Sequence, residues 1–311
     1  MNREFTHTTV LLQPAIERLM VDSTGVYIDG TFGRGGHSRE LLEKLGEAGR
    51  VFGIDRDPVA ADTGQKLAAE DSRFKMSRES FARLGAFAEQ HGLTGRVSGI
   101  LLDLGVSSPQ LDDVSRGFSF LQDGPLDMRM DPERGQSAGA WLAGAKEKDI
   151  ADVLKTFGEE RYARRIARAI VTARAEHPIE TTGQLAAIVK QANPNWERDK
   201  HPATRAFQGI RIFINGELSA LQEALNDSLE VLRIGGRLVV ISFHSLEDKI
   251  VKNFMSLQTK GDNFPRDLPV LYNDLHPTLK LIGKPIRPDE DEIRVNPRSR
   301  SAIMRVAERI A

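Results

Sequence analysis

One stretch decides the fold of this chain: Tyr27-Ile28-Asp29-Gly30-Thr31-Phe32-Gly33-Arg34-Gly35-Gly36-His37. It begins as a short apolar strand, continues through an acid, and ends in a glycine-rich turn that opens a helix. Glycines let the backbone approach a ligand closely, and the start of a helix presents free N–H groups. The stretch therefore predicts a nucleotide-cofactor loop, with an ordinary strand–helix turn as the alternative.

The spacing of the glycines narrows the choice of cofactor. A dinucleotide-binding loop carries the pattern G-x-G-x-x-G. The glycines here fall at positions 30, 33, 35 and 36, and no window across them gives that pattern. An acid that precedes the glycines is the usual first motif of methyltransferases that use S-adenosylmethionine (SAM).

The composition bounds the class of protein. A chain of 311 residues has room for about two domains, or for one domain with a large insertion. The absence of cysteine excludes disulfides, thiolate chemistry and cysteine-ligated metals. The seven histidines show no metal-binding spacing, so no metal site is predicted. The net charge of −1 gives no global basic field that would attract nucleic acid.

The ends and the hydropathy predict where the protein works. Residues 1–10 are polar and lack the apolar core of a signal peptide, and no segment reaches membrane-spanning length. We therefore expect a cytoplasmic protein with no membrane partner.

Four short apolar runs have the character of buried parallel strands. They are Val26–Ile28, Val51–Ile54, Ile100–Leu104 and Leu238–Phe243. Helical segments, Ser38–Leu45 and Val59–Ala69, separate the first three runs. This alternation predicts a doubly wound, Rossmann-like α/β sheet, and Ala302–Ala307 is expected to add a last strand at its edge.

More than a hundred residues separate the third and fourth runs, far more than one crossover needs. Helices are expected at Ala163–Ala175, Thr182–Gln191 and Asn215–Leu232, the last as the crossover into the final strand. We therefore expect an α/β domain at 1–112 and 213–311, with an inserted, mostly helical domain at 113–212. The proline-spaced stretch Phe264–Pro288 reads as an extended surface connection without an assigned role.

Three of the predicted strands end in an acid: Asp29, Asp55 and Asp103. Ligands of open α/β sheets bind outside the carboxyl ends of the strands. Asp55 can accept both ribose hydroxyls of an adenosine-containing cofactor. The alternative, an aspartate that caps the next helix, suits Asp57 before Pro58 better.

Asp103 opens the loop Asp103-Leu104-Gly105-Val106-Ser107-Ser108-Pro109-Gln110. An exocyclic amine is a poor nucleophile because its lone pair is delocalised into the base. Acceptors that grip its N–H groups can orient the nitrogen toward a methyl donor. Asp103, Ser107, Ser108 and Pro109 are therefore candidate catalytic residues, with an Asp/Ser-rich turn as the equal alternative.

Two further clusters of polar residues each have a functional and a structural interpretation. His244 and the acids after it fit the cleft, but a helix N-terminus is the favoured interpretation. Arginines at 161, 164, 165 and 168 share one helical face, and Arg205 and Arg211 extend the group. That face predicts RNA phosphate contacts with Tyr162 nearby for stacking, or equally a solvated charged surface.

Several longer motifs occur along nearly the whole chain. They are His7–Leu12, Asp29–His37, Leu102–Leu111, Arg116–Phe120, Gly124–Asp131, Phe157–Ile170, His201–Arg211 and Ile241–Lys249. Together they resemble the bacterial 16S rRNA cytosine-N(4) methyltransferase family (MraW/RsmH type). The resemblance implies a class I SAM methyltransferase domain at 1–112 and 213–311, with a helical insertion at 113–212 that helps to recognise the substrate.

The resemblance also implies a substrate and a set of contacts. The substrate is the exocyclic amine of cytosine 1402 in the decoding region of 16S rRNA, within the small ribosomal subunit. The implied cofactor contacts are Gly35, Gly36, His37, Asp55, Phe81, Asp103 and Gln110. The RNA contacts expected from the arginine cluster are Arg161, Arg164, Arg165, Arg168 and Arg205.

Two rival functions follow from the same residues. A non-catalytic ribosome-assembly factor would use SAM only to order its fold, and a small-molecule methyltransferase would leave the arginine face without a role. The sequence leaves open whether the protein is a homodimer.

Overall fold

The computed structural model describes residues 9–195, 201–261 and 275–311. The chain divides into two compact units: Met1–Gly105 with Leu218–Ala311, called here the sheet unit, and Val106–Glu217, the helical unit. The expected insertion, 113–212, falls inside the helical unit, whose ends lie several residues further out. Val106 and Leu111 explain the difference at the first end, because both pack against the helical core.

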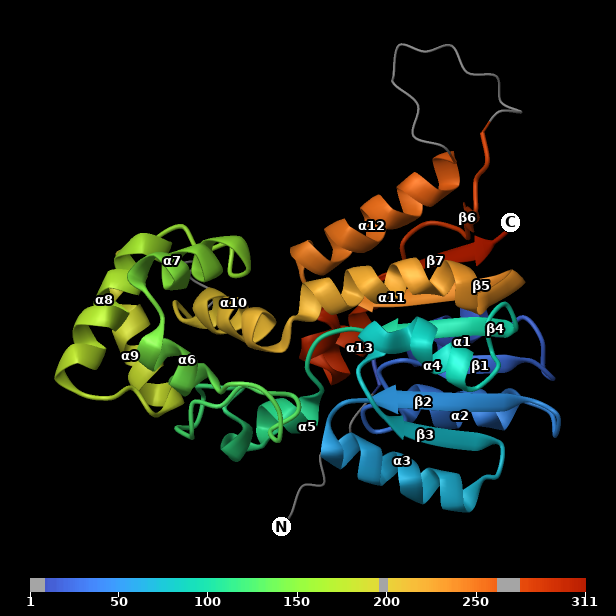
Figure 1. Ribbon diagram of the computed structural model, residues 1–311, viewed down its shortest axis with the longest axis horizontal. Helices are drawn as coiled ribbons and strands as arrows, with labels where there is room; N and C mark the ends of the chain where they lie inside the picture. The colour runs from blue at the N-terminus through green and yellow to red at the C-terminus, as the bar shows by residue number, and fades with distance from the viewer. Residues whose placement is uncertain (1–8, 196–200, 262–274) are drawn as a thin grey trace. The chain divides into compact units, whose positions relative to one another are not determined.

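The sheet unit is built on one seven-stranded sheet in the order β3-β2-β1-β4-β5-β7-β6 (Figure 1). Its strands are β1 (Val26–Asp29), β2 (Arg50–Asp55), β3 (Phe74–Arg78), β4 (Val97–Asp103), β5 (Leu232–Ser242), β6 (Leu279–Leu281) and β7 (Ile303–Arg309). The first five run parallel, and β7 pairs antiparallel with both β5 and β6. The α/β, Rossmann-like class I fold is confirmed.

Both faces of this sheet are buried, which is why its strands are continuous apolar runs. Ile28, Ile100 and Val240 point to one core, which includes residues of α4, α11 and α12. Tyr27 and Leu101, one position along their strands, point to the other core with α1, α2 and α3. The helices of the sheet unit are α1 (Leu12–Leu19), α2 (Gly36–Lys44), α3 (Pro58–Glu70), α4 (Leu84–Gln90), α11 (Glu217–Val231), α12 (Ser245–Lys260) and α13 (Glu290–Val295).

Two strands differ from expectation. The strand β3 was not predicted, because Phe74 is its one buried residue and the rest of Phe-Lys-Met-Ser-Arg forms no apolar run. The expected last strand exists as β7, but it is not the edge, since β6 pairs along its outer side. The strand β6 lies within the stretch expected to be an extended connection, of which residues 264–274 fall outside the described part.

The expected helix Asn215–Leu232 is interrupted at its start. Helix α10 (Thr204–Asn215) ends there, and Gly216 adopts the left-handed conformation with φ 58°. Helix α11 then covers Glu217–Val231, and β5 begins at once. Gly235 and Gly236 therefore lie within β5, at a register shift against β4, rather than in a connecting turn.

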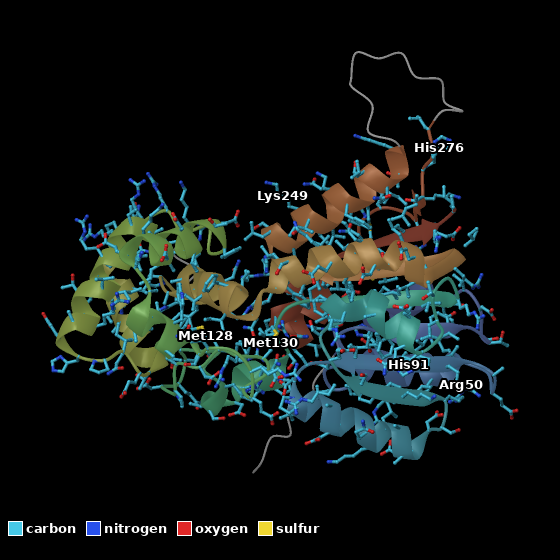
Figure 2. All side chains as sticks on the ribbon, viewed as in Figure 1. Arg50, His91, Met128, Met130, Lys249 and His276 are labelled. Atoms are coloured by element: carbon cyan, nitrogen blue, oxygen red, sulfur yellow. The ribbon has the colours of Figure 1, made fainter. Side chains whose placement is uncertain are left out.

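The helical unit has its own apolar core. Its other helices are α5 (Ser108–Asp112), α6 (Ala138–Gly144), α7 (Glu147–Thr156), α8 (Ala163–Glu176) and α9 (Thr182–Ala192). Met128 and Met130, labelled in Figure 2, are buried in that core. Asn215 fixes the segment that carries them, because its side-chain amide donates to the carbonyl of Met128 (2.7 Å) and accepts from the N–H of Met130 (2.8 Å).

No helix in the described ranges is long and apolar enough to cross a membrane.

Candidate functional site

Asp29 fastens the glycine loop to the sheet. It ends β1 with only 3% of its surface exposed. Its carboxylate accepts from the N–H of Thr31 (3.2 Å) and from the hydroxyl of Ser38 on α2 (2.7 Å). Burial raises the pKa of Asp29 to about 6, although both hydrogen bonds favour the ionised form. These contacts make Asp29 a support for the loop.

Asp55, the last residue of β2, contacts the loop from the neighbouring strand. Its Oδ2 accepts from the N–H of Gly33 (2.9 Å), and its Oδ1 accepts from the N–H of Asp57 (2.9 Å). A carboxylate offers about four lone-pair sites, so two remain for ribose hydroxyls. Asp57 caps α3 through the N–H of Val59 (3.0 Å), as its position before proline predicted. The sequence did not reveal that Asp55 also supports the loop.

Gly35 and Gly36 form the start of α2. Gly35 is the N-cap with φ 78°, a conformation that disfavours other residues. A Cβ at Gly36 would lie 1.9 Å from the hydroxyl of Thr9, so only glycine fits beneath the N-terminal segment. The N–H groups at the start of this nine-residue helix suit a carboxylate such as the amino-acid end of SAM.

Asp103 ends β4 and lies close to the same loop. Its N–H donates to the hydroxyl of Thr31 (2.6 Å), and its Oδ2 lies 3.8 Å from Nδ1 of buried His37. Its Oδ1 is buried and has no hydrogen-bond partner among the described residues. Buried acceptors are almost always paired, so this atom marks where a ligand donor belongs.

Two further carboxylates share this neighbourhood. Glu247 is buried, and its Oε2 accepts from the N–H of Phe243 (2.8 Å) while Oε1 lies 3.1 Å from Nε2 of His244. His244 is the N-cap of α12, so the helix-start interpretation of this segment is confirmed. Burial raises the pKa of Asp103 well above its usual range, and the charges of Asp29, Glu247 and Glu292 add to that rise. Glu247 is one of the acids after His244 that the sequence placed near the cleft, whereas Glu292 was not predicted because it lies far along the chain from the other acids.

This concentration of acids suits an organic cation. A bound positive charge would relieve the mutual repulsion of the carboxylates. Within the described part of the chain, no three His, Asp or Glu side chains are arranged to hold a metal ion. The clustered negative charge of the carboxylates fits SAM, which carries a sulfonium and an ammonium group.

Phe81 lies next to the first glycine of the loop. It begins a short 3-10 helix, Phe81–Arg83, and is partly buried against the core of the sheet unit. A Cβ at Gly30 would lie 3.4 Å from Cβ of Phe81. The side chain therefore starts close to the cofactor loop, and its stacking on adenine stays a prediction.

The loop that follows Asp103 enters the helical unit at Val106. Ser107 is the N-cap of α5, and Oε1 of Gln110 accepts from its N–H (2.9 Å) in a capping box. Ser108 and Pro109 form the first turn of that helix. This geometry matches the turn alternative at Ser107–Gln110, and the catalytic and cofactor roles there stay predictions.

Four of the predicted RNA-binding arginines are exposed: Arg161, Arg164, Arg165 and Arg168. Arg168 lies 3.6 Å from Glu147 with 78% of its side chain exposed, where an ion pair contributes little. Arg205 is half-buried and donates to the carbonyl of Glu159 (2.8 Å). The face on α8 thus presents positive charge to solvent.

Two other aromatic or basic residues near this face have structural contacts. Arg211 forms a two-fold hydrogen-bonded pair with buried Glu217 (2.9 and 2.8 Å) and does not extend the exposed patch. Tyr162 packs against the helical core, beneath Arg161. The sequence could not reveal either contact, because both partners are set by the tertiary fold.

The sequence pattern of the MraW methylase family matches residues 4–310. The chain belongs to the MraW methylase family. As a member it is a SAM-dependent rRNA methyltransferase.

Several solved structures are also similar to this chain. One is an rRNA methylase from Streptococcus thermophilus, 10% identical, with a TM-score of 0.41 and coverage of 96% of this chain and 92% of that chain. Another is a Streptococcus mutans protein in complex with S-adenosylhomocysteine (SAH), 11% identical, with a TM-score of 0.42 and coverage of 97% and 99%. TrmN from Thermus thermophilus is 12% identical, with a TM-score of 0.44 and coverage of 96% and 48%. These likenesses are distant, and the family match alone identifies the chain.

Proposed function

We propose that this enzyme methylates the exocyclic N4 amine of cytosine 1402 in the decoding region of 16S rRNA, with the small ribosomal subunit as its partner in the cytoplasm. The observation that carries the proposal is Asp103. In a methylase of this family, a buried carboxylate oxygen without a partner lies at the carboxyl end of β4. That atom can accept a hydrogen bond from an amine and fix its orientation.

The chemistry assigns separate tasks to the residues of the sheet unit. When bound, SAM supplies an electrophilic methyl group. Gly35, Gly36 and His37 would hold its amino-acid end, Asp55 its ribose and Phe81 its adenine. Asp103 would accept an N–H of the target amine, which holds the nitrogen lone pair in line for attack.

Asp103 also offers a place for the proton that the amine loses. A cytosine amine that gains a methyl group becomes strongly acidic, so its proton must leave to water or to a nearby base. Burial and three neighbouring carboxylates raise the pKa of Asp103, which makes this carboxylate a better proton acceptor than an exposed one. We propose Asp103 as that acceptor.

The exposed arginines support an RNA substrate. Four positive charges are presented together, by Arg161 just before α8 and by Arg164, Arg165 and Arg168 within it. Such a face can neutralise backbone phosphates without reading base sequence. The choice of cytosine would then rest with the residues that grip the amine.

Mass spectrometry of 16S rRNA tests the proposal. Nucleolytic fragments that contain cytosine 1402 are compared from cells with the protein, without it, and with the Asp103→Ala variant. We expect a methyl group on N4 in the first sample only. If methylation is unchanged in cells that lack the protein, the target assignment is wrong. If the purified protein binds small subunits but the rRNA carries no methyl group, the protein is an assembly factor.

A further inference from the structure

Glu292 joins the two ends of the chain at the cofactor loop. It lies in α13, near the C-terminus, and its Oε1 accepts a hydrogen bond of 2.8 Å from the backbone N–H of Leu11. Figure 1 shows α13, drawn in red, at the end of the sheet toward which the β2 arrow points. This is the end where Asp29, Asp55 and Asp103 gather.

The backbone at Leu11 needs such a fixing contact. Leu11 has φ 51°, in the left-handed region that a leucine rarely adopts, and it is 1% exposed. Its carbonyl begins α1 by accepting from the N–H of Ala15 (2.8 Å). The hydrogen bond to Glu292 therefore holds a strained turn in place from outside.

That turn forms part of the cofactor loop's surroundings. Two residues before Leu11, the side chain of Thr9 packs directly on the backbone of Gly36. Glu292 thus acts on the start of α2 through Leu11 and Thr9. Its charge also reaches Asp103, where it adds to the negative field of Asp29 and Glu247.

The charge of the ligand changes during the reaction. SAM carries a net charge of +1 from its sulfonium, ammonium and carboxylate groups, whereas SAH has lost the sulfonium and is neutral. A fixed negative charge beside the pocket lowers the free energy of the cation and leaves that of the neutral product nearly unchanged.

We propose that Glu292 is a specificity-determining residue of the cofactor site, which holds the Leu11 turn against the glycine loop and places there a negative charge that favours SAM over SAH. The inference rests on the cofactor and not on the RNA target. It can therefore be tested by binding alone, without rRNA.

Two variants separate the two parts of this role. Glu292→Gln keeps an acceptor oxygen for the N–H of Leu11 but removes the charge. Glu292→Ala removes both. Asp291→Asn is the matched control, because it removes the same charge one residue away, where Asp291 is 85% exposed and pairs with Arg294.

Isothermal titration of the full chain measures the dissociation constants for SAM, SAH and sinefungin, in which a protonated amine replaces the sulfonium. For Glu292→Gln we expect affinity for SAM and sinefungin to fall about three- to tenfold relative to SAH. Hydrogen exchange should show the amide of Leu11 still protected in Glu292→Gln and unprotected in Glu292→Ala. Asp291→Asn should leave all three affinities within about twofold.

The proposal is overturned if Glu292→Gln weakens all three ligands equally, since the charge would then not discriminate between them. It is also overturned if Asp291→Asn shifts the SAM-to-SAH ratio as much as Glu292→Gln does. If the amide of Leu11 stays protected from exchange in Glu292→Ala, Glu292 does not hold the Leu11 turn in place. None of these outcomes depends on which nucleotide the enzyme methylates.

Discussion

Nδ1 of His37 lies 3.8 Å from Oδ2 of Asp103. The two residues come from the start of α2 and the end of β4, so their approach links the cofactor loop to the proposed catalytic carboxylate. The distance exceeds that of a hydrogen bond. It leaves Oδ1 of Asp103 as the acceptor available to a substrate amine.

Replacing Asp103 should abolish methyl transfer. Asp103→Ala removes both the acceptor for the amine and the proposed proton acceptor, and we expect kcat to fall about 10²–10⁴-fold. Asp103→Asn keeps an acceptor oxygen but cannot take a proton, so its activity should lie between that of the wild type and that of Asp103→Ala. Transfer from labelled SAM to small ribosomal subunits measures the effect. Full activity in a folded Asp103→Ala variant would rule out a catalytic role.

Asp55 and Asp57 offer a matched pair. Asp55→Ala removes the acceptor for Gly33 and the proposed ribose contact, so we expect SAM to bind about 10- to 100-fold more weakly. Asp57→Ala removes the cap of α3, which should cost about 1 kcal/mol of stability with unchanged SAM affinity. Titration calorimetry and urea unfolding distinguish the two. Equal losses of SAM affinity in both variants would argue against a ribose contact.

Asp29 should make stability depend on pH. Its pKa in the folded protein is about 6, above the ordinary value of 3.8, so the folded state binds more protons than the unfolded state between these values. The resulting stabilisation is present below about pH 4 and is lost as the pH rises through about 6. We expect the difference in unfolding free energy between the wild type and Asp29→Asn to change by about 2 kcal/mol between pH 4.5 and 7.5.

The asparagine variant suits this measurement because it keeps the shape and both contacts of Asp29. Its amide can still accept from the N–H of Thr31 and can donate to the hydroxyl of Ser38. Urea unfolding of the SAM-free protein at several pH values gives the difference directly. A difference that does not vary with pH would show that Asp29 has an ordinary pKa.

The arginine face should matter for RNA and not for the cofactor. Reversing the charge of Arg164 and Arg168 should raise KM for small subunits about tenfold or more and reduce the salt dependence of binding, while SAM affinity stays unchanged. Reversal of Arg18 and Lys66, which are exposed on α1 and α3, changes the net charge equally and serves as the control. If both double variants lose the same activity on native subunits, the loss is a general effect of charge and not a property of the arginine face.

Much of the fold was predictable from the sequence because buried parallel strands leave a local signature. The apolar runs at Val51–Ile54 and Ile100–Leu104 match β2 and β4 closely, since both faces of the sheet are covered. The strand β3 has one buried residue and left no such signature. The break at Gly216 was missed because the leucine spacing beyond it continues the helical pattern.

The residues of the candidate site also include some that the sequence predicted and some that it did not. Asp29, Asp55 and Asp103 were found because each ends a strand, and strand ends meet at one edge of a parallel sheet. Arg211 was assigned to the exposed patch because spacing along a helix does not show which side chains find buried partners. Its pairing with Glu217 exists only across the turn at Gly216.

The sequence by itself determined the α/β class, the glycine loop, the acids at the strand ends and the family. These features are local, since each depends on residue types at short spacing. The tertiary structure alone decided that Glu247 and Glu292 join Asp103, and that Glu292 holds Leu11 across almost the whole chain. Charges and hydrogen bonds act through space, so the order of residues along the chain does not reveal which of them meet.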